Sequence, residues 1–274
     1  MAESGFRRNS RRGILIATAL ILLAVTGLCE IVNLVIPRAD GSRAWQDSGA
    51  TLDASHADIG YIMVKKKSSK KLKVRIVVND TTYTYDLNGE GSYEVYPLQQ
   101  GSGDYKIVVY ENVRGNSYAQ LLSKTISVKM DNEKAAFLCP NRYVSYDGDT
   151  QIINYAQELF SDQDSNREKA EKLAKWMKQS FSYDYITALT VKSGYVPDLD
   201  ATFERRLGMC FDFSAMMCAV MRSQGIPAQL VMGDADGTYH AWCKIWLDEK
   251  WVLFDPTMDI MGNKVSNYIE EAYY

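Results

Sequence analysis

The stretch GMCFDFSAMMCAVMRSQGIP, residues 208–227, carries the clearest structural signal in the chain. Its apolar middle predicts a helix that begins near Cys210. Gly225 is a typical residue for ending a helix, and Pro227 prevents the helix from continuing. A cysteine therefore stands where the helix begins, and three interpretations are open: a nucleophile, a metal ligand or a small apolar residue of the core.

The position of Cys210 would suit a nucleophile. A thiol attacks as the thiolate, and a helix N-terminus or a nearby imidazole lowers the pKa of a thiol from about 8.5. Gly208 permits a tight entry to the helix and a close approach by substrate. The backbone N–H groups of the helix start, including that of Cys210, could stabilise an oxyanion. Taken alone, the signal does not exclude a buried core cysteine, because free cysteines are often buried.

The chain contains only two histidines that could serve as a base for Cys210. His56 lies in the small, polar stretch of residues 37–58, which we expect to be a flexible stalk. His240 lies in YHAWCKIWL, residues 239–247, which has the composition of a strand. His240 is therefore the only base that a folded site around Cys210 could use.

Hairpin geometry offers His240 a carboxylate partner. If residues 248–249 form a two-residue loop between two strands, Asp255 lies opposite Trp242 and diagonally next to His240 on one face. An odd loop without a bulge would break this register. The loop sequence Asp-Glu also lacks the glycine that a type I′ turn prefers.

Cysteine, histidine and carboxylate in this order are the nucleophile, base and orienting group of acyl transfer. Between about residues 150 and 259, the chain resembles the transglutaminase-like superfamily. The resemblance rests on GMC at residues 208–210, RSQGIP at 222–227, HAW at 240–242 and WVLFDPT at 251–257, together with SYDY at 182–185.

The resemblance implies an α+β fold with a papain-like transglutaminase core, in which helices pack on an antiparallel sheet. It implies Cys210 as nucleophile, His240 as general base and acid, and Asp255 as the carboxylate that fixes the imidazole tautomer. Tyr183 is a candidate oxyanion donor or a core residue, and Trp242 shields the His–Asp contact or simply packs the hairpin. No metal ion or organic cofactor is required.

Two other interpretations remain open. Cys210, Cys218, His240 and Cys243 could form a Cys3His zinc site, but seven residues separate the first two cysteines, whereas structural zinc sites usually have about two to four. Cys218 is better explained as core, and Cys243 points away from the face of His240. A non-catalytic surface protein could also keep the same fold for binding.

The N-terminal part of the chain has the pattern of a membrane anchor. Four arginines precede an uncharged run that begins at residue 13 and continues past Glu30 to residue 36. The run exceeds the roughly 20 residues that a spanning helix needs. We expect a cytoplasmic tail at residues 1–12, an uncleaved transmembrane helix at 13–36 and an extracytoplasmic remainder in the cell membrane. A cleaved signal peptide and secretion are the alternative.

Short runs of β-branched and aromatic residues between turn signals predict a small all-β sandwich over residues 59–130. The lysine-rich stretch at residues 64–73 is most simply a solvated loop, with wall or protein binding as an alternative. A helical period begins near residue 150, and Ser165 with Glu168 forms a capping box at a helix start. We therefore place a catalytic domain at residues 140–274.

Composition limits the possible partners. The 274 residues are 46% hydrophobic and carry a net charge of -3, which offers no electrostatic basis for binding nucleic acid. The five cysteines are an odd number, so at least one free thiol is expected. The expected substrates are proteins or peptides, at the cell surface or wall. Transfer of the acyl group to an amine and its hydrolysis by water, as in a protease or amidase, remain equally open.

Overall fold

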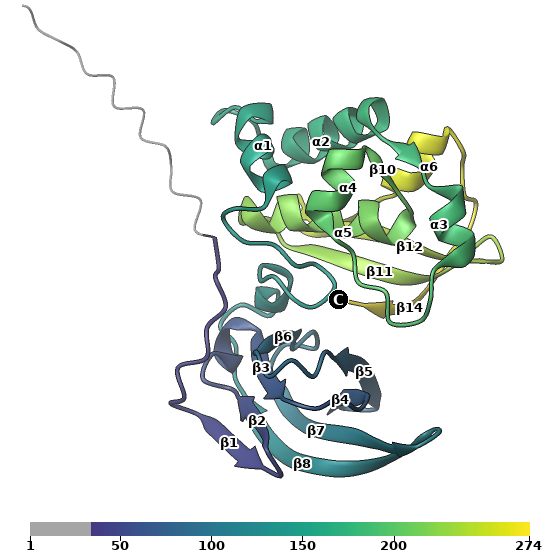
Figure 1. The fold of residues 1–274 in the computed structure, drawn as a ribbon. Coiled ribbons are helices and arrows are strands. Elements are labelled where there is room, and N and C mark those ends of the chain that lie inside the picture. Colours follow the sequence, from purple (N-terminus) through teal and green to yellow (C-terminus); the bar gives the residue numbers. More distant parts are fainter. Residues whose placement is uncertain (1–33) are drawn as a thin grey trace, which may run out of the picture. The chain divides into compact units, whose positions relative to one another are not determined.

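The computed structural model describes residues 34–274 (Figure 1). The expected cytoplasmic tail and nearly all of the expected membrane helix lie outside these residues. Within the described residues, no helix has both the length and the apolar character needed to cross a membrane.

The N-terminal half of the described chain is a module of two four-stranded antiparallel sheets, here called the β-module. One sheet has the order β1-β2-β3-β6 and the other β5-β4-β7-β8. Alternate residues of both sheets share one buried core, which is the arrangement of a sandwich. The strands are β1 (Ala44–Asp47), β2 (Ala50–Asp53), β3 (Tyr61–Lys66), β4 (Leu72–Val78), β5 (Thr81–Leu87), β6 (Glu94–Pro97), β7 (Gly103–Arg114) and β8 (Ser117–Val128), with the short 3-10 helix η1 (Ala57–Ile59) after β2.

The prediction of a flexible stalk at residues 37–58 is wrong for most of that range. β1 and β2 form a hairpin around Ser48 and Gly49, both of which have positive φ angles. β2 then pairs with β3, and Ala50 and Leu52 are completely buried. Two apolar residues in an otherwise polar stretch are enough for a short strand of a larger sheet. The loop expected at the lysine-rich residues 64–73 is shorter than expected, because the first residues of this stretch belong to β3 and the last to β4.

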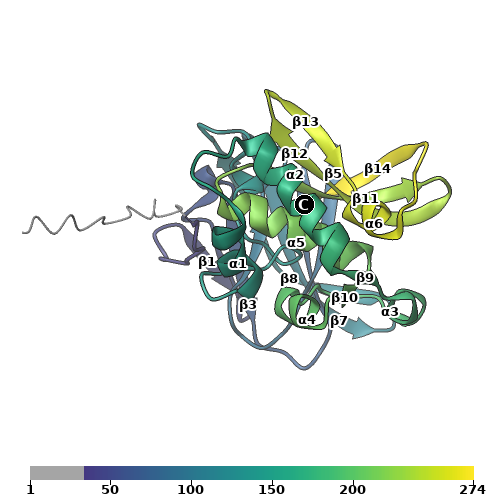
Figure 2. The same ribbon diagram turned by 90° about the horizontal axis from the view of Figure 1, so that it is seen from above.

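The C-terminal half contains a sheet of order β13-β12-β11-β14, entirely antiparallel, and a two-stranded parallel pair β9-β10 (Figure 2). Helices pack on one another and on this sheet, as the resemblance implies. The elements are α1 (Gln151–Leu159), α2 (Asn166–Ser180), β9 (Ser182–Tyr183), α3 (Tyr185–Thr190), α4 (Leu199–Arg205), β10 (Leu207–Gly208), α5 (Cys210–Ser223), β11 (Ala228–Ala235), β12 (Thr238–Leu247), β13 (Lys250–Phe254), α6 (Pro256–Met261) and β14 (Tyr268–Tyr273); the 3-10 helix η2 (Ala135–Phe137) precedes them.

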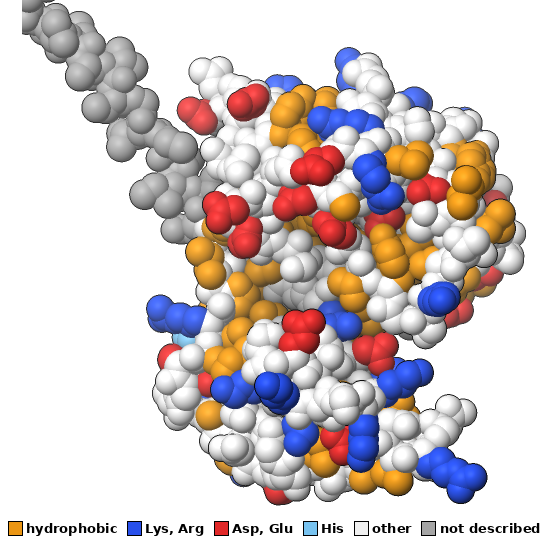
Figure 3. All heavy atoms as spheres, viewed as in Figure 1, with side chains coloured by type: hydrophobic (Ala, Val, Ile, Leu, Met, Phe, Trp, Pro, Cys, Tyr) orange, Lys and Arg blue, Asp and Glu red, His pale blue; other side chains and the backbone are white. Residues whose placement is uncertain are grey.

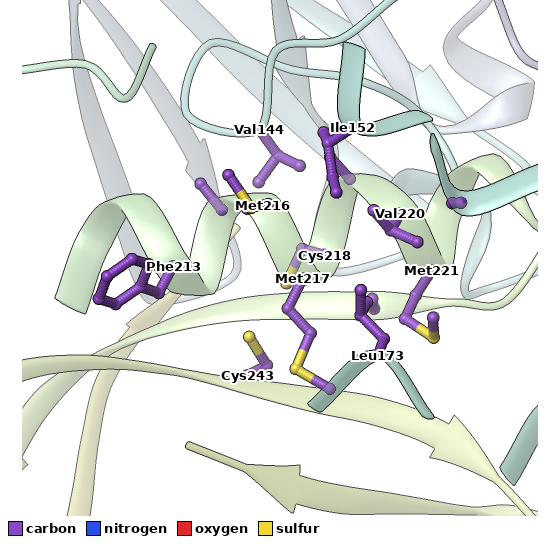
Figure 4. Packing of buried hydrophobic residues seen from close by; sticks show 14 of the residues in the cluster. Val144, Ile152, Leu173, Phe213, Met216, Met217, Cys218, Val220, Met221 and Cys243 are labelled. Atoms are coloured by element: carbon purple, nitrogen blue, oxygen red, sulfur yellow. The ribbon is translucent and has the colours of Figure 1, made fainter. Parts of the chain in front are cut away.

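Helix α5 is the centre of this half. Every residue from Asp212 to Ser223 is buried, because β11 and β12 lie on one side and α1, α2, α4 and α6 lie around the rest. Figure 4 shows Met217 directed toward Leu173 of α2 and Cys243 of β12, and Met216 on the side of Val144. A helix that is apolar on all sides is stable only in such surroundings.

Candidate active site

Cys210 is the first residue of α5, as predicted, and its side chain is partly exposed. Met209 before it is extended, and its backbone N–H donates to a carboxylate oxygen of Asp212 at 2.9 Å. The other oxygen of Asp212 accepts from the hydroxyl of Tyr195 at 2.6 Å. Asp212 therefore caps the helix start and fixes the loop that carries Tyr195. Burial raises the pKa of Asp212, against these hydrogen bonds.

Gly208 provides the expected tight entry to α5, and a close approach by substrate stays a prediction. A Cβ atom there would lie 3.0–3.1 Å from side-chain atoms of Thr202, Asp212 and Phe213. The absence of a side chain therefore lets the strand before Cys210 pack tightly against α4 and α5.

The β12–β13 hairpin has the predicted register. Leu247 pairs with Lys250 across the two-residue turn, and Cys243 pairs with Phe254. This register brings Nε2 of His240 to 2.8 Å from Oδ2 of Asp255, with both side chains buried. Since Nε2 is engaged, Nδ1 is the ring nitrogen left for Cys210.

Asp255 is held by two further groups. It is the N-cap of α6, and its Oδ1 accepts from the backbone N–H of Met258 at 3.0 Å. The hydroxyl of Tyr268, on β14, donates to Oδ2 at 2.8 Å. Both donors fix the carboxylate in the orientation in which it faces His240.

The charge of His240 follows from its neighbours. Burial lowers the pKa of the imidazole, but hydrogen bonds to Asp255 and Cys210 and the negative charge of both groups outweigh it. The resulting pKa is about 9. His240 therefore stays protonated at neutral pH when Asp255 and Cys210 lie beside it, which suits a group that must give a proton to a leaving amine.

Trp242 covers one side of this pair. It is completely buried, stacks on His240 with the ring centroids 6.2 Å apart, and lies 4.9 Å from the ring of Tyr268. A Cβ atom at Gly233 would lie 2.0 Å from the backbone carbonyl oxygen of Ile269 and 3.0 Å from the indole ring of Trp242, so this glycine lets β14 and the indole approach β11 closely. The burial of the indole fits the packing interpretation of Trp242, and shielding of the His–Asp contact stays a prediction.

Tyr183 lies on β9, where it pairs with Gly208 two residues before Cys210. Its ring is partly buried and lines the same cavity as Cys210. Burial and the charges nearby, that of Cys210 first among them, raise its pKa to about 12. The phenol therefore keeps its proton and is available as a hydrogen-bond donor next to the thiol.

The other described cysteines lie in the core. Cys218 and Cys243 are completely buried between α5 and β12, and the Cys243 thiol donates to the carbonyl of Ser214 at 3.2 Å. Burial raises the pKa of Cys243, and it raises that of Cys139 to about 12. Residues 34–274 contain no group of three His, Cys, Asp or Glu side chains placed to hold a metal ion.

Cys210 and His240 open into a cavity of about 580 Å³. Its walls come from α3 and the loop after it, from the β11–β12 hairpin and from Lys73, Thr84 and Asp86 of the β-module. The loops at residues 189–200 and 234–239, which sequence analysis cannot place, both contribute to this cavity. A cavity of this size accommodates a few residues of a polypeptide.

Residues 153–256 match the family model of the transglutaminase-like superfamily, and the match includes Cys210, His240 and Asp255. These residues form a transglutaminase-like domain.

The chain is also similar to several known proteins. The uncharacterised protein YebA of Bacillus subtilis is 24% identical over 196 residues, which are 63% of this chain and 26% of that protein. A protein-glutamine gamma-glutamyltransferase of Pseudomonas aeruginosa is 31% identical over 27% of this chain and 13% of its own length. The chain thus spans about a quarter or less of these relatives. The solved periplasmic domain of TgpA from Pseudomonas aeruginosa, bound to ethylmercury, is 16% identical, covers 71% of this chain and 92% of that one, and has a TM-score of 0.40.

Some residues that line the cavity or hold Asp255 have no motif in the sequence. Tyr268 follows α6 in a tail that has no recognisable period, and Tyr195 lies in an irregular loop. Lys73 and Asp86 belong to strands more than 120 residues before Cys210. The sequence YIEEAY, residues 268–273, does not alternate apolar and polar residues, so no strand period indicates β14.

Proposed function

We propose that the chain is a cysteine acyl-transfer enzyme that acts on carboxamide or peptide bonds of protein or peptide substrates. The observation that carries this proposal is the position of His240, which lies between Cys210 and Asp255 in the wall of an open cavity. The name of the Pseudomonas aeruginosa relative favours the side-chain amide of glutamine as the acyl donor.

In the first step, the Cys210 thiolate attacks the amide carbon and forms a C–S bond. In this proposal, the backbone N–H of Cys210 and the hydroxyl of Tyr183 stabilise the negative oxygen of the tetrahedral intermediate. The C–N bond then breaks, and His240 gives its proton to the departing ammonia or amine. The product of this step is a thioester on Cys210.

In the second step, an amine attacks the thioester carbon, His240 accepts the proton of that amine, and the Cys210 thiolate departs. With a lysine amine as the acceptor, the product is an isopeptide crosslink. Water in place of the amine would make the protein an amidase or protease. The partial exposure of Cys210 supports this second candidate, because water can reach the thioester.

The decisive experiment incubates the full chain with a glutamine-containing peptide and a tagged primary amine, followed by mass spectrometry. We expect the tagged amide product, with the deamidated peptide as the hydrolytic outcome. Cys210→Ser should abolish both products, and Cys218→Ser should retain them. A folded wild-type chain that gives neither product would contradict the proposal and favour a binding protein with the same fold.

We also propose that residues 13–36 anchor the chain in the cell membrane, with the transglutaminase-like domain outside the cytoplasm. The four arginines before the apolar run support this orientation. In intact spheroplasts, an added protease should degrade the part of the chain after residue 36. Protection of this part until the membrane is lysed would contradict the orientation, and its release into the medium would indicate a cleaved signal peptide.

A further inference from the structure

The cavity of Cys210 is not formed by the transglutaminase-like domain alone. Lys73 of β4 and Asp86 of β5 line it from the β-module. In β4, Leu72 and Val74 point into the core of the β-module, so Lys73 between them lies on the outer face of the sheet. Asp86 is its direct partner across the strands, and Nζ of Lys73 lies 2.5 Å from the Asp86 carboxylate.

A second cavity, of about 660 Å³, begins at the same ion pair. The two cavities share Lys73, Asp86 and Ser193 in their walls. The loop after α3 contacts the β-module here, since a Cβ atom at Gly194 would lie 3.2 Å from a carboxylate oxygen of Asp86. The two cavities therefore adjoin at this ion pair.

The second cavity is positively charged. Its charged lining residues are Lys70, Lys71, Lys73 and Asp86, three lysines against one aspartate. Lys73 is paired with Asp86, and Lys70 lies 3.4 Å from Glu111. Lys71 is exposed and has no carboxylate within salt-bridge distance among residues 34–274. Figure 3 shows that basic side chains gather over the strands of the β-module.

The loop that carries Lys71 is held in place. The backbone carbonyl of Lys71 accepts from the N–H of Asn112 at 2.8 Å, and the N–H of Ser68 donates to the carbonyl of Gly89 at 3.0 Å. The hydroxyl of Ser68 donates to Glu111 at 2.7 Å. A positive charge on a fixed loop is suited to recognising an acidic side chain, since the loop loses little freedom on binding.

We propose that the β-module forms the outer half of the substrate site, and that Lys71 binds an acidic side chain of the polypeptide whose glutamine reaches Cys210. This inference rests on the proposed function and adds to it a substrate class: polypeptides that carry glutamate or aspartate near the reactive glutamine. The acidic residue lies in the second cavity, where three lysines outnumber Asp86 and where Asp86 is paired with Lys73.

The test compares synthetic peptides with one glutamine in a glycine–serine background. One peptide is neutral, one carries two glutamates before the glutamine and one carries them after it. With the full chain, we expect a lower KM for one of the two acidic peptides. Lys71→Glu should raise this KM by about fivefold, as expected for one reversed surface charge, and leave kcat unchanged. The effect should shrink as the salt concentration rises.

The control variant is Lys129→Glu, which reverses an exposed lysine of the β-module that lines neither cavity. It should change no KM, and Lys71→Glu should not change the KM of the neutral peptide. Equal effects of the two variants, or no preference for either acidic peptide, would overturn the inference. Turnover of the neutral peptide tests the proposed function separately. Binding of fluorescent peptides to the Cys210→Ala chain should show the same preference without catalysis.

Discussion

At the residue scale, the charge of His240 is controlled by groups from three different elements. The imidazole is buried, which favours its neutral form, yet its pKa is raised to about 9 because Asp255 and Cys210 lie beside it. Asp255 in turn is oriented by α6 and by Tyr268 of β14. The imidazole is thus protonated because of the groups that surround it, and histidine alone would not be protonated at neutral pH.

Replacing Asp255 with asparagine tests this arrangement. Because the carboxylate raises the pKa of His240, its removal should lower that pKa, and the alkaline limb of kcat/KM should move from about pH 9 toward neutral pH. kcat/KM itself should fall by about 100-fold or more, since the imidazole loses its orienting partner. The measurement is the pH profile of amine incorporation into a glutamine peptide.

Tyr268→Phe is the matched control. It removes a hydrogen bond to the same oxygen of Asp255 but keeps the carboxylate, so the pKa of His240 should stay high or rise further. We expect about a tenfold loss of activity from poorer orientation, with no shift of the alkaline limb toward neutral pH. If the alkaline limb of kcat/KM moved to lower pH by the same amount in both variants, Asp255 would not be the group that sets the pKa of His240.

The sequence predicts His240 and Asp255 because a hairpin has few possible registers. A two-residue turn determines which residues face each other, and that geometry can be worked out from the residue numbers. Tyr268 could not be found in this way, because it lies beyond α6, in a strand on the other side of β11. No local pattern encodes its contact with Asp255, which depends on how the whole sheet is assembled.

At the element scale, the turn of the β12–β13 hairpin adopts the predicted length despite unfavourable residues. Asp248 and Glu249 both have positive φ angles, 51° and 60°, as a type I′ turn requires. An ion pair with Arg167, whose guanidinium lies 2.6 Å from the Asp248 carboxylate, offsets part of the cost of the positive φ angle at Asp248. Glu249 is exposed and has no ion pair among residues 34–274. No side-chain interaction therefore offsets the free-energy cost of its positive φ angle.

Glu249→Gly should therefore stabilise the protein. A non-glycine residue in the left-handed region costs roughly 1–2 kcal/mol, and part of the gain is lost to the greater freedom of glycine in the unfolded chain. The free energy of unfolding should rise by about 0.5 kcal/mol, measured by urea denaturation. Glu249→Ala keeps a Cβ atom and should give no gain. A glycine variant no more stable than the alanine variant would show that the turn is unstrained.

Elements with strong local signals were predictable, whereas elements that depend on tertiary contacts were not. The capping box of Ser165 and Glu168 marks the start of α2 correctly, and α5 begins and ends as its residues indicate. β1 and β2 were missed because they contribute few apolar residues and gain stability only from pairing with β3. The short helices α3 and α4 begin at the aspartate caps Asp184 and Asp198, whose signal is weak without an apolar stripe.

At the scale of the whole molecule, the described residues form one compact unit. The β-module contacts the end of β14, where the side-chain amide of Gln99 donates to the carbonyl of Tyr273 at 3.2 Å and that of Gln100 to its hydroxyl at 2.8 Å. Rings of Tyr85 and Tyr274 also meet at 5.6 Å. These contacts hold Lys73 and Asp86 opposite Cys210, which an independent spacer could not do.

Arg222 joins the segments that meet behind this contact. It belongs to the RSQGIP motif and is almost completely buried, yet no carboxylate within residues 34–274 forms a salt bridge with it. Its guanidinium donates to the carbonyls of Cys139, Ala228 and Tyr274 at 2.7–2.9 Å. It therefore links the segment that leaves the β-module with the start of β11 and the residue after β14.

Arg222→Lys should destabilise the whole unit although it keeps the charge. A lysine ammonium cannot reach three carbonyls from the direction of a planar guanidinium, and each hydrogen bond to the cation that is lost costs free energy. We expect the free energy of unfolding to fall by about 3 kcal/mol in urea denaturation. Arg167→Lys, at an exposed ion pair, should cost less than about 1 kcal/mol. Since Arg222 joins both halves, the two halves should lose stability together, measured by hydrogen exchange of the backbone amides in each half. A loss confined to the C-terminal half would show that the two halves unfold separately.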